Sequence, residues 1–413
     1  MGNTPNIRFK GFVDDWERHK VTELGDIYIG LVTTMTAHYT DHGTLLIRNS
    51  DIKDGKFEFD TEPIYLDDEF AEANKSRMHK IGDVITVHTG DVGTSAVITE
   101  NEVNSIGFAT IVTRPNKEIL DSYYLSTFLN TDKHKNWAVQ MSTGDGRTNY
   151  NLREYTELIV PIPAIDEQKK IAEYIMDLNN LITLHQRKYD EVKQLKKFML
   201  QKMFPKNGEL IPEIRFAGFT GNWEQRKAAD IAEYSKGNGY SKSDLTEIGT
   251  PIILYGRLYT KYQFVINEVD TFAAPKESAI YSEGNEVIIP ASGETAEDIV
   301  RASAVEKSGV LLGSDLNILR PFDFINPLFL ALAISNGEPQ KELAKRAQGK
   351  SVVHIHNSDI QEVSISYPTR TEQDQIVAVF RNLDSLITLH QHKCDQLKEV
   401  KRFMLQNMFP QKG

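Results

Sequence analysis

The sequence predicts an α+β protein in which two mixed α/β globular blocks are separated by two long helices that form an antiparallel coiled coil, as a pseudo-twofold internal repeat. Two observations support this prediction. Two segments 205 positions apart share the runs LITLHQ and FMLQxMFP. Apolar residues in both segments recur at alternating steps of four and three, which is the 3.5-residue repeat of a coiled coil. We therefore divide the chain into a first block, a central helix, a second block and a distal helix (1–165, 166–205, 206–369 and 370–413).

The repeat also includes the start of each globular block. Residues 7–17 are IRFKGFVDDWE and residues 214–224 are IRFAGFTGNWE, whereas the interiors of the blocks share only faint similarity. The order of the repeat is circular, because the tail FPQKG corresponds to the linker that follows the first helix. We therefore expect the two chain ends to lie close together.

The first block should contain a strand, a Gly-rich turn and a second strand over 81–101, followed by a helix over 122–130. The second block should contain the same pattern over 283–300, followed by a helix over 326–335. Both blocks are thus predicted to be mixed α/β structures with many short strands.

Each long helix is predicted from its coiled-coil seam. Each follows a proline-bounded strand, carries an acidic residue (Glu167 or Glu372) in its first turn, which suits the helix dipole, and ends at a Phe-Pro pair. Roughly 38 residues at about 1.5 Å each give a rod of about 57 Å. Short connections then require the two rods to run antiparallel. The seam residues are Ile175, Leu178, Ile182, His185, Tyr189 and Val192 in the first helix and Phe380, Leu383, Ile387, His390, Cys394 and Leu397 in the second.

Both seams contain polar residues, His185 and Lys196 in the first helix and His390 and Lys401 in the second. Buried polar seam residues usually fix the register of a coiled coil. No further His, Asp or Glu cluster at ligand spacing accompanies either histidine, so we expect no metal site.

The charge distribution repeats as well. The formal net charge is −11, of which blocks 1–165 and 208–369 contribute −9 and −7, and the helical segments 166–207 and 370–413 contribute +3 and +2. An acidic chain is not a simple basic nucleic-acid binder. The single cysteine excludes an internal disulfide, and no apolar run is long enough for a membrane span. We expect a cytoplasmic protein.

Catalytic motifs are missing from the sequence. The GKS run at 349–351 lacks the phosphate-loop glycine, because residue 344 is alanine. Neither HExxH nor GxSxG occurs, and Asn326-Pro327-Leu328-Phe329 lacks the second proline of an amino-methyltransferase motif. We expect no catalytic residue in this chain.

Taken together, the two LITLHQ…FMLQxMFP helices, the two IRFxGFxxxWE openings and the PxP…EQ approach to each helix resemble the DNA-specificity subunit of type I restriction–modification systems, over essentially the whole chain. The resemblance implies that each block is a target-recognition domain for one half of a bipartite double-stranded DNA sequence. It implies that the helices set the spacer and dock two methyltransferase subunits, to which two restriction and translocation subunits add. S-adenosylmethionine, ATP and Mg would be bound by those partners, and this chain would be no enzyme.

Candidate DNA contacts lie mainly in a polar, glycine-containing loop near the end of each block, where side chains can bond base edges or phosphates. These candidates are Arg147, Thr148, Asn149, Tyr150, Lys350, Ser351, His354 and His356. The Gly-rich turns at 89–94 and 292–295, with Tyr39, Lys261 and Tyr262, are further candidates.

Two other functions remain open at this point. A scaffold of two protein- or peptide-binding domains on a coiled-coil rod explains the negative charge better than a DNA-binding protein does. A nuclease fused to its own recognition domains would need a catalytic cluster, which the sequence lacks. If the chain does recognise DNA, its acidic blocks cannot hold DNA through counterion release alone. We then expect weak binding by the isolated chain, with the phosphate contacts made largely by the methyltransferase subunits.

Overall fold

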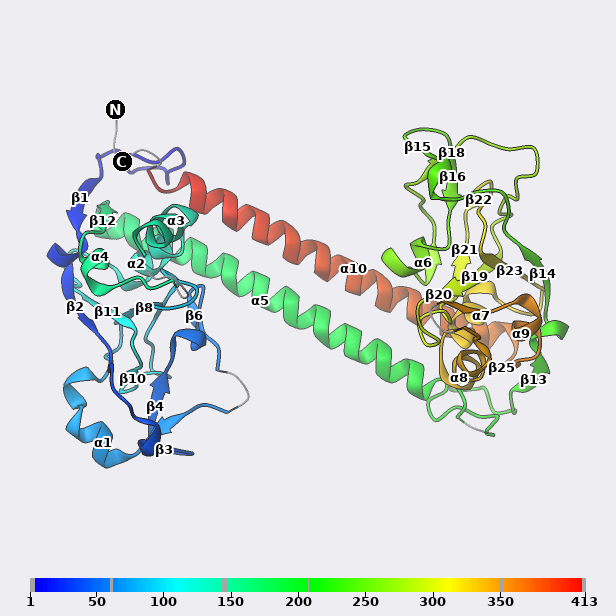
Figure 1. The fold of residues 1–413 in the computed structure, drawn as a ribbon, viewed down its shortest axis with the longest axis horizontal. Coiled ribbons are helices and arrows are strands. Elements are labelled where there is room, and N and C mark those ends of the chain that lie inside the picture. The colour runs from blue at the N-terminus through cyan, green and yellow to red at the C-terminus, as the bar shows by residue number, and fades with distance from the viewer. Residues whose placement is uncertain (1–3, 60–61, 143–147, 207, 350–351, 411–413) are drawn as a thin grey trace. The chain divides into compact units, whose positions relative to one another are not determined.

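The computed structural model describes residues 4–59, 62–142, 148–206, 208–349 and 352–410 (Figure 1). They form two compact units, which we describe separately. Unit 1 combines the residues up to Arg187 with those from Gln391 onward, and unit 2 runs from Lys188 to His390. Each unit therefore contains one globular block and a part of both long helices. Among the described residues, no helix has the length and apolar character needed to cross a membrane.

The long helices are α5 (Ile165–Lys202) and α10 (Arg370–Asn407), each of 38 residues, as expected. Every predicted seam position on both helices is buried or half-buried, whereas most other positions beyond the first turns are exposed. This burial pattern confirms the alternating steps of four and three. Each helix ends two residues before the phenylalanine of its Phe-Pro pair.

Within each unit the two helices contact one another along this seam. In unit 1 the Cys394 Sγ lies 3.7 Å from the Gln186 Oε1 and 4.0 Å from the carbonyl oxygen of Ile182. In unit 2 the Lys196 Nζ donates to the Asp384 Oδ1 at 2.5 Å. The polar seam residue Lys196 therefore makes an ion pair between the two helices, and its role in fixing register stays a prediction.

The block of unit 1 consists of two four-stranded sheets, with strand orders β2-β11-β8-β9 and β10-β4-β7-β3, and two small pairs, β1-β12 and β5-β6. Its strands are β1 (Glu17–Lys20), β2 (Gly25–Ile29), β3 (Tyr39–Thr40), β4 (Thr44–Ile47), β5 (Ile52–Lys53), β6 (Lys56–Phe57), β7 (Tyr65–Leu66), β8 (Val84–Thr86), β9 (Ser95–Val97), β10 (Ile106–Gly107), β11 (Ile111–Pro115) and β12 (Ile159–Ile162). Its helices are α1 (Asp68–Ala73), α2 (Ser122–Leu129), α3 (Asp132–Met141) and α4 (Leu152–Thr156).

The block of unit 2 repeats this plan with one five-stranded sheet, β14-β23-β19-β21-β17, one four-stranded sheet, β15-β18-β16-β22, and the pairs β13-β25 and β20-β24. Its strands are β13 (Glu224–Lys227), β14 (Ala232–Lys236), β15 (Leu245–Thr246), β16 (Thr250–Ile253), β17 (Val265–Ile266), β18 (Phe272–Ala273), β19 (Glu286–Pro290), β20 (Ser292–Gly293), β21 (Ser303–Val305), β22 (Leu311–Leu312), β23 (Leu316–Pro321), β24 (Val353–His354) and β25 (Ser364–Tyr367). Its helices are α6 (Arg257–Thr260), α7 (Pro327–Ile334), α8 (Gly337–Arg346) and α9 (Asn357–Gln361).

Most element predictions for the blocks are confirmed. The helices expected at 122–130 and 326–335 are α2 and α7, and the hairpin expected at 81–101 is the antiparallel pair β8-β9. The prediction that a second hairpin ends by residue 300 is wrong. Strand β19 pairs with β21, which begins only at Ser303, because a longer connection that contains β20 separates the two strands.

Equivalent aromatic contacts anchor the Phe-Pro end of a long helix in each core. In unit 1 the Trp16 ring meets Phe409 edge to face at 6.2 Å, and in unit 2 the Trp223 ring meets Phe204 at 6.0 Å. Both tryptophans are 1% exposed, so each centres a buried cluster that joins the block to its helix end. Such edge-to-face pairs add to the free energy gained by burial alone.

The circular order of the repeat is visible in two backbone hydrogen bonds. In unit 2 the Ile214 N–H donates to the carbonyl oxygen of Lys202 at 2.9 Å, just after the chain leaves α5. In unit 1 the Ile7 N–H donates to the carbonyl oxygen of Asn407 at 2.9 Å, between segments 400 residues apart in the chain. The prediction that the two chain ends lie close together is confirmed for these described residues.

The Glu-Gln pair at the start of each long helix holds that helix to its block. The Gln168 side chain accepts from the Asp121 N–H and donates to the carbonyl oxygens of Ile119 and Pro163, at 2.9 Å each. Gln373 repeats the same three bonds with Asn326, Phe324 and Pro368. Both glutamines are fully buried, so the motif has a structural role at the helix start.

Candidate nucleic-acid interface

In unit 1 the Gly-rich turn after β8 and the late polar loop meet side by side. An isolated β-bridge joins Thr89 to Asn149, and the Thr89 Oγ1 donates to the Asn149 Oδ1 at 2.8 Å. The Tyr150 N–H donates to the carbonyl oxygen of His88 at 2.8 Å, which continues the pairing. Two segments that are 60 residues apart in the chain therefore present one polar edge.

In unit 2 the Gly-rich turn and the polar loop meet through a regular strand pair. We call this meeting of turn and loop the junction of each unit. Strand β20 pairs antiparallel with β24, so that Ser292 faces His354 and Gly293 faces Val353. The Ser292 Oγ and the His354 Nδ1 lie 3.1 Å apart, within hydrogen-bonding distance. Asn149 and His354 stand 205 positions apart, the same offset as the long helices. The structure thus brings together the predicted turn and loop in both units, with different side chains at equivalent positions.

Glycines allow each turn to lie close to the helix that supports it. Gly93 has φ +83°, and a Cβ at this position would lie 3.0 Å from atoms of His134 and Ala138 in α3. A Cβ on Gly293 would lie 2.7 Å from the Tyr259 hydroxyl oxygen. A larger residue at either position would push the turn away from the structure that supports it.

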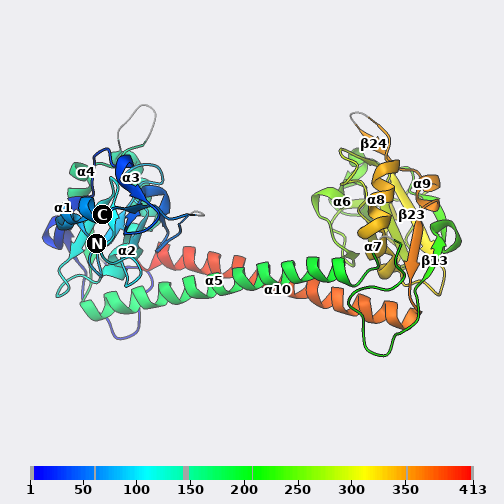
Figure 2. The ribbon, with the colours of Figure 1, turned by 90° about the horizontal axis from the view of Figure 1, so that it is seen from below.

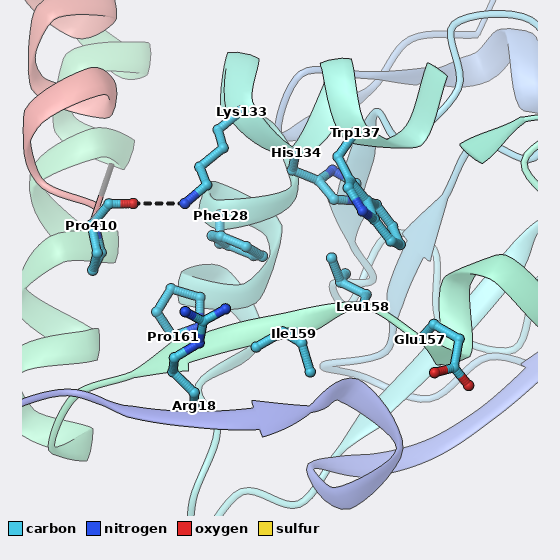
Figure 3. Close-up of a pocket in the computed structure, with 10 residues that line it drawn as sticks. All are labelled: Arg18, Phe128, Lys133, His134, Trp137, Glu157, Leu158, Ile159, Pro161 and Pro410. Atoms are coloured by element: carbon cyan, nitrogen blue, oxygen red, sulfur yellow. Dashed lines mark hydrogen bonds between the residues drawn. The ribbon is translucent and has the colours of Figure 1, made fainter. Parts of the chain in front are cut away.

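Tyr150 is a core residue, and the prediction that it contacts DNA is wrong for this structure. Its side chain is fully buried, with its ring 5.9 Å from both His134 and Trp137. Burial raises its pKa and lowers the pKa of His134 to about 4. His134 and Trp137 line a neighbouring cavity of about 270 Å³, where the Lys133 Nζ donates to the carbonyl oxygen of Pro410 (Figure 3). Tyr150 therefore anchors the loop in the core of the block and positions the neighbouring Asn149.

The remaining candidates fall into three groups. Thr148, His354 and His356 are exposed on the loops, and His356 also precedes α9 with its N–H donating to Asp359. Tyr39 lies on strand β3, in a different sheet from the β8 turn. Arg147, Lys350 and Ser351 lie outside the described residues.

Helix α6 adds aromatic and basic groups beside the unit 2 junction. The Tyr259 hydroxyl donates to the carbonyl oxygen of Ser292 at 2.8 Å. Tyr262 is 40% exposed and donates to the carbonyl oxygen of Ala302 at 3.1 Å. Lys261 and Tyr262, which follow this helix, are thus connected to the turn through Tyr259. Sequence reasoning missed Tyr259, although an aromatic residue three positions before the candidate Tyr262 is a usable signal.

Sequence reasoning also missed two supporting residues in unit 1. The Asn49 Oδ1 accepts from the His88 N–H at 2.8 Å, and the Asn49 Nδ2 lies 3.3 Å from the carbonyl oxygens of Phe108 and Ala109. The His88 Nδ1 lies 2.7 Å from the Thr89 Oγ1. Asn49 is 39 residues from the turn in the chain, so only the tertiary fold brings it there.

Three described cations around the unit 2 junction, Arg257, Lys261 and Arg301, are already paired with acids. Lys261 and Arg257 both contact Asp270, and these hydrogen bonds hold the pKa of Asp270 below its usual range. Arg301 pairs with Asp298. These three cations therefore add little surplus positive charge to the surface.

The described residues contain no group of three or more His, Cys, Asp or Glu side chains that could hold a metal ion. The site is thus a polar, glycine-supported edge in each unit. Such an edge can donate and accept hydrogen bonds to another molecule.

The family model for the type I restriction modification DNA specificity domain matches the chain twice, at residues 14–194 and 220–399. The type I restriction enzyme MjaVIII specificity subunit of Methanocaldococcus jannaschii is 20% identical over 297 residues, which cover 69% of this chain and 68% of that protein. The crystal structure of a type I restriction-modification S subunit from M. genitalium has a TM-score of 0.65 at 14% identity and covers 99% of this chain and 100% of its own.

A chain from a structure that describes complex assembly and conformational transition of the type I restriction-modification system has a TM-score of 0.51 at 17% identity. It covers 97% of this chain and 99% of its own. Both solved structures share the fold, and the two family matches together span most of the sequence. The chain therefore belongs to the type I restriction-modification DNA specificity family, as a specificity subunit with two copies of the specificity domain.

Proposed function

We propose that each unit recognises one half of a bipartite double-stranded DNA target through the junction of its Gly-rich turn and its polar loop. The observation that supports this most is the pair of equivalent positions with different chemistry, Thr89 with Asn149 in unit 1 and Ser292 with His354 in unit 2. An asparagine amide can bond adenine in the major groove, whereas an imidazole offers a different donor and acceptor pattern. Two similar frames with different side chains suit two different half-sites.

The charge distribution supports phosphate binding mainly by the methyltransferase subunits rather than by this chain. Blocks 1–165 and 208–369 carry −9 and −7, and Arg257, Lys261 and Arg301 beside the unit 2 junction are paired with acids. Because both blocks are negatively charged overall, little affinity comes from counterion release. We expect the isolated chain to bind DNA weakly and the methyltransferase subunits to supply most phosphate contacts.

The paired helices would set the distance between the half-sites and dock the methyltransferase subunits. On both helices a second stripe of apolar residues lies one position before the seam and is 41–55% exposed. In unit 1 the stripe consists of Leu181, Leu184, Val400 and Phe403, and in unit 2 of Leu386, Leu389, Leu195 and Phe198. Exposed apolar stripes of this kind suit packing against helices of another subunit. Their repetition in the two units suits two copies of that subunit.

In this proposal the chain has no catalytic role of its own. Methylation with S-adenosylmethionine would occur on two methyltransferase subunits, and ATP- and Mg-dependent cleavage on two restriction and translocation subunits. The structure described as complex assembly of a type I system supports an assembled complex of this general kind. The four-subunit partner count comes from the family resemblance.

Sequencing of methylated bases in cells that express this chain with its methyltransferase subunit tests the proposal. His354→Ala should relax or change one half of the methylated motif, and Asn149→Ala should do the same to the other half. Glu118→Ala, at an exposed position between β11 and α2, serves as a surface control. Changes in both halves after one substitution would contradict separate recognition by the two units.

A further inference from the structure

A groove with basic walls borders the same stretch of a long helix in each unit. In unit 2 a groove of about 770 Å³ lies between the last turns of α5 and the start of α8. In unit 1 a groove of about 530 Å³ lies between the last turns of α10, the stretch 176–183 of α5, the segment Asp54–Lys56 and the start of α3. The two grooves share the last turns of one long helix and the start of α3 or α8, which belong to the duplicated frame, and they differ in the segments that complete them.

Each groove is lined by a basic triad with the same spacing. The triads are Lys193, Lys196 and Lys197 in unit 2 and Lys398, Lys401 and Arg402 in unit 1. Residues at i, i+3 and i+4 share one face of a helix, so the three charges of each triad point to the same side. Each member of one triad lies 205 positions from its counterpart in the other, which is the offset of the repeat.

Only the central residue of each triad is neutralised by an acid. The Lys196 Nζ lies 2.5 Å from the Asp384 Oδ1, and the Lys401 Nζ lies 2.7 Å from the Asp54 Oδ2. For the four outer residues, none of the ion pairs among the described residues supplies an acid. The outer residues are Lys193 and Lys197 in unit 2 and Lys398 and Arg402 in unit 1.

The size and place of the groove fit a peptide segment better than DNA. A volume of 500–800 Å³ is in the range of pockets that enclose a ligand or a few side chains. In unit 2 helix α8 runs from Gly337, which lines the groove, to Arg346, just before the loop that contains β24. Ten residues separate the two by about 15 Å. Figure 2 shows β24 at the end of unit 2 that lies away from α10. The groove is thus a separate surface from the junction that faces DNA in our proposal.

We propose that each groove binds an acidic segment of one methyltransferase subunit, with carboxylates paired to the outer residues of the triad. The inference rests on the proposed docking of two such subunits and adds the chemistry of the contact. The apolar stripe would supply buried area, and the two grooves would fix which surface of the partner docks and how it is oriented. Ion pairs in partly open grooves are screened by salt, so assembly should weaken as salt rises.

Native mass spectrometry and titration calorimetry with the methyltransferase subunit of the same system test this inference. Lys193→Glu/Lys197→Glu should leave one subunit bound normally and weaken the other by about tenfold or more, because like charges then face each other. Lys398→Glu/Arg402→Glu should affect the other copy in the same way. The charge-preserving Lys193→Arg/Lys197→Arg should bind two subunits, as should Lys236→Glu/Lys307→Glu, which changes the charge of unit 2 equally but outside the groove.

The outcomes separate the groove from the docking itself. If the unaltered chain binds no methyltransferase subunit, the proposed docking and this inference both fail. If the unaltered chain binds two and the reversals bind two with equal affinity at low salt, docking stands and the acidic contact is wrong. If assembly is unchanged but DNA affinity of the complex falls, the grooves bind phosphates instead. Lys193→Gln/Lys197→Gln adds no like charge and should give a smaller loss, which guards against a folding defect in the reversal.

Discussion

The Arg8 guanidinium donates two hydrogen bonds to the Glu167 carboxylate, at 2.7 and 2.8 Å, and the Glu167 side chain is fully buried. The pair joins the IRF segment at the start of the chain to the first turn of α5. Arg215 and Glu372 repeat it in unit 2 with the same two distances. A buried carboxylate of this kind is tolerated only while its bidentate partner is present.

Arg8→Ala should therefore destabilise unit 1 by about 3 kcal/mol, because it leaves the charge of Glu167 buried without a partner. Arg8→Ala/Glu167→Gln should be less destabilised than Arg8→Ala, since the glutamine carries no charge. Urea unfolding of both variants and of Glu167→Gln completes a double-mutant cycle. Equal stability of Arg8→Ala and the unaltered chain would contradict a structural role for the pair.

The repeated frame could be predicted from the sequence because its signals are local. The spacing of apolar residues in steps of four and three predicted both helices and their seam residues. The Glu-Gln and Phe-Pro pairs predicted where each helix begins and ends. The circular order gave the proximity of Ile7 to Asn407. Each of these features depends on spacing within one segment or on comparison between the two copies.

The site was harder to predict because it depends on contacts between distant segments. In the sequence Tyr150 belongs to a polar, glycine-containing loop, which predicts an exposed side chain. Its burial depends on contacts with His134 and Trp137 in α3. Asn49 and Tyr259 support the two junctions from other strands and helices. The meeting of turn and loop was therefore predictable only as two separate candidate segments.

Gly293→Ala should affect recognition of one half-site only. The new Cβ would lie 2.7 Å from the Tyr259 hydroxyl oxygen, so strand β20 must shift away from α6 and carry Ser292 with it. Tyr259→Phe removes the clashing oxygen, and Gly293→Ala/Tyr259→Phe should recover part of the loss. Methylated-base sequencing compares the two halves of the motif. Equal changes in both halves would show that the effect is a general loss of stability.

Matched heptad insertions in α5 and α10 should lengthen the gap in the DNA target and leave its half-sites unchanged. Seven residues preserve the 3.5-residue seam and add about 10 Å to each helix, which is roughly three base pairs. An insertion in only one helix should disrupt pairing, because the two seams then differ in length. A changed half-site with an unchanged gap, read by methylated-base sequencing, would contradict a spacer role for the helices.

Acidification should destabilise unit 1 through two buried histidines. Desolvation lowers the pKa of His134 and of His79 to about 4, whereas an unfolded histidine has a pKa near 6.5. The unfolded chain therefore takes up protons first as the pH falls. The contribution of these histidines to the free energy of unfolding is fully present above pH 6.5. It is lost between there and about pH 4, by up to about 3 kcal/mol for each histidine.

His134→Asn isolates one of these two contributions. Its amide can still donate to the Leu129 carbonyl oxygen, which accepts from the His134 Nδ1 at 2.6 Å. Urea midpoints at pH 7.5, 6 and 5, followed by tryptophan emission, should fall with about half the slope of the unaltered chain, because His79 still titrates. The Trp137 ring lies 6.1 Å from His134 and reports on this region. An unchanged slope in the variant would mean that His134 is not neutral and buried at physiological pH.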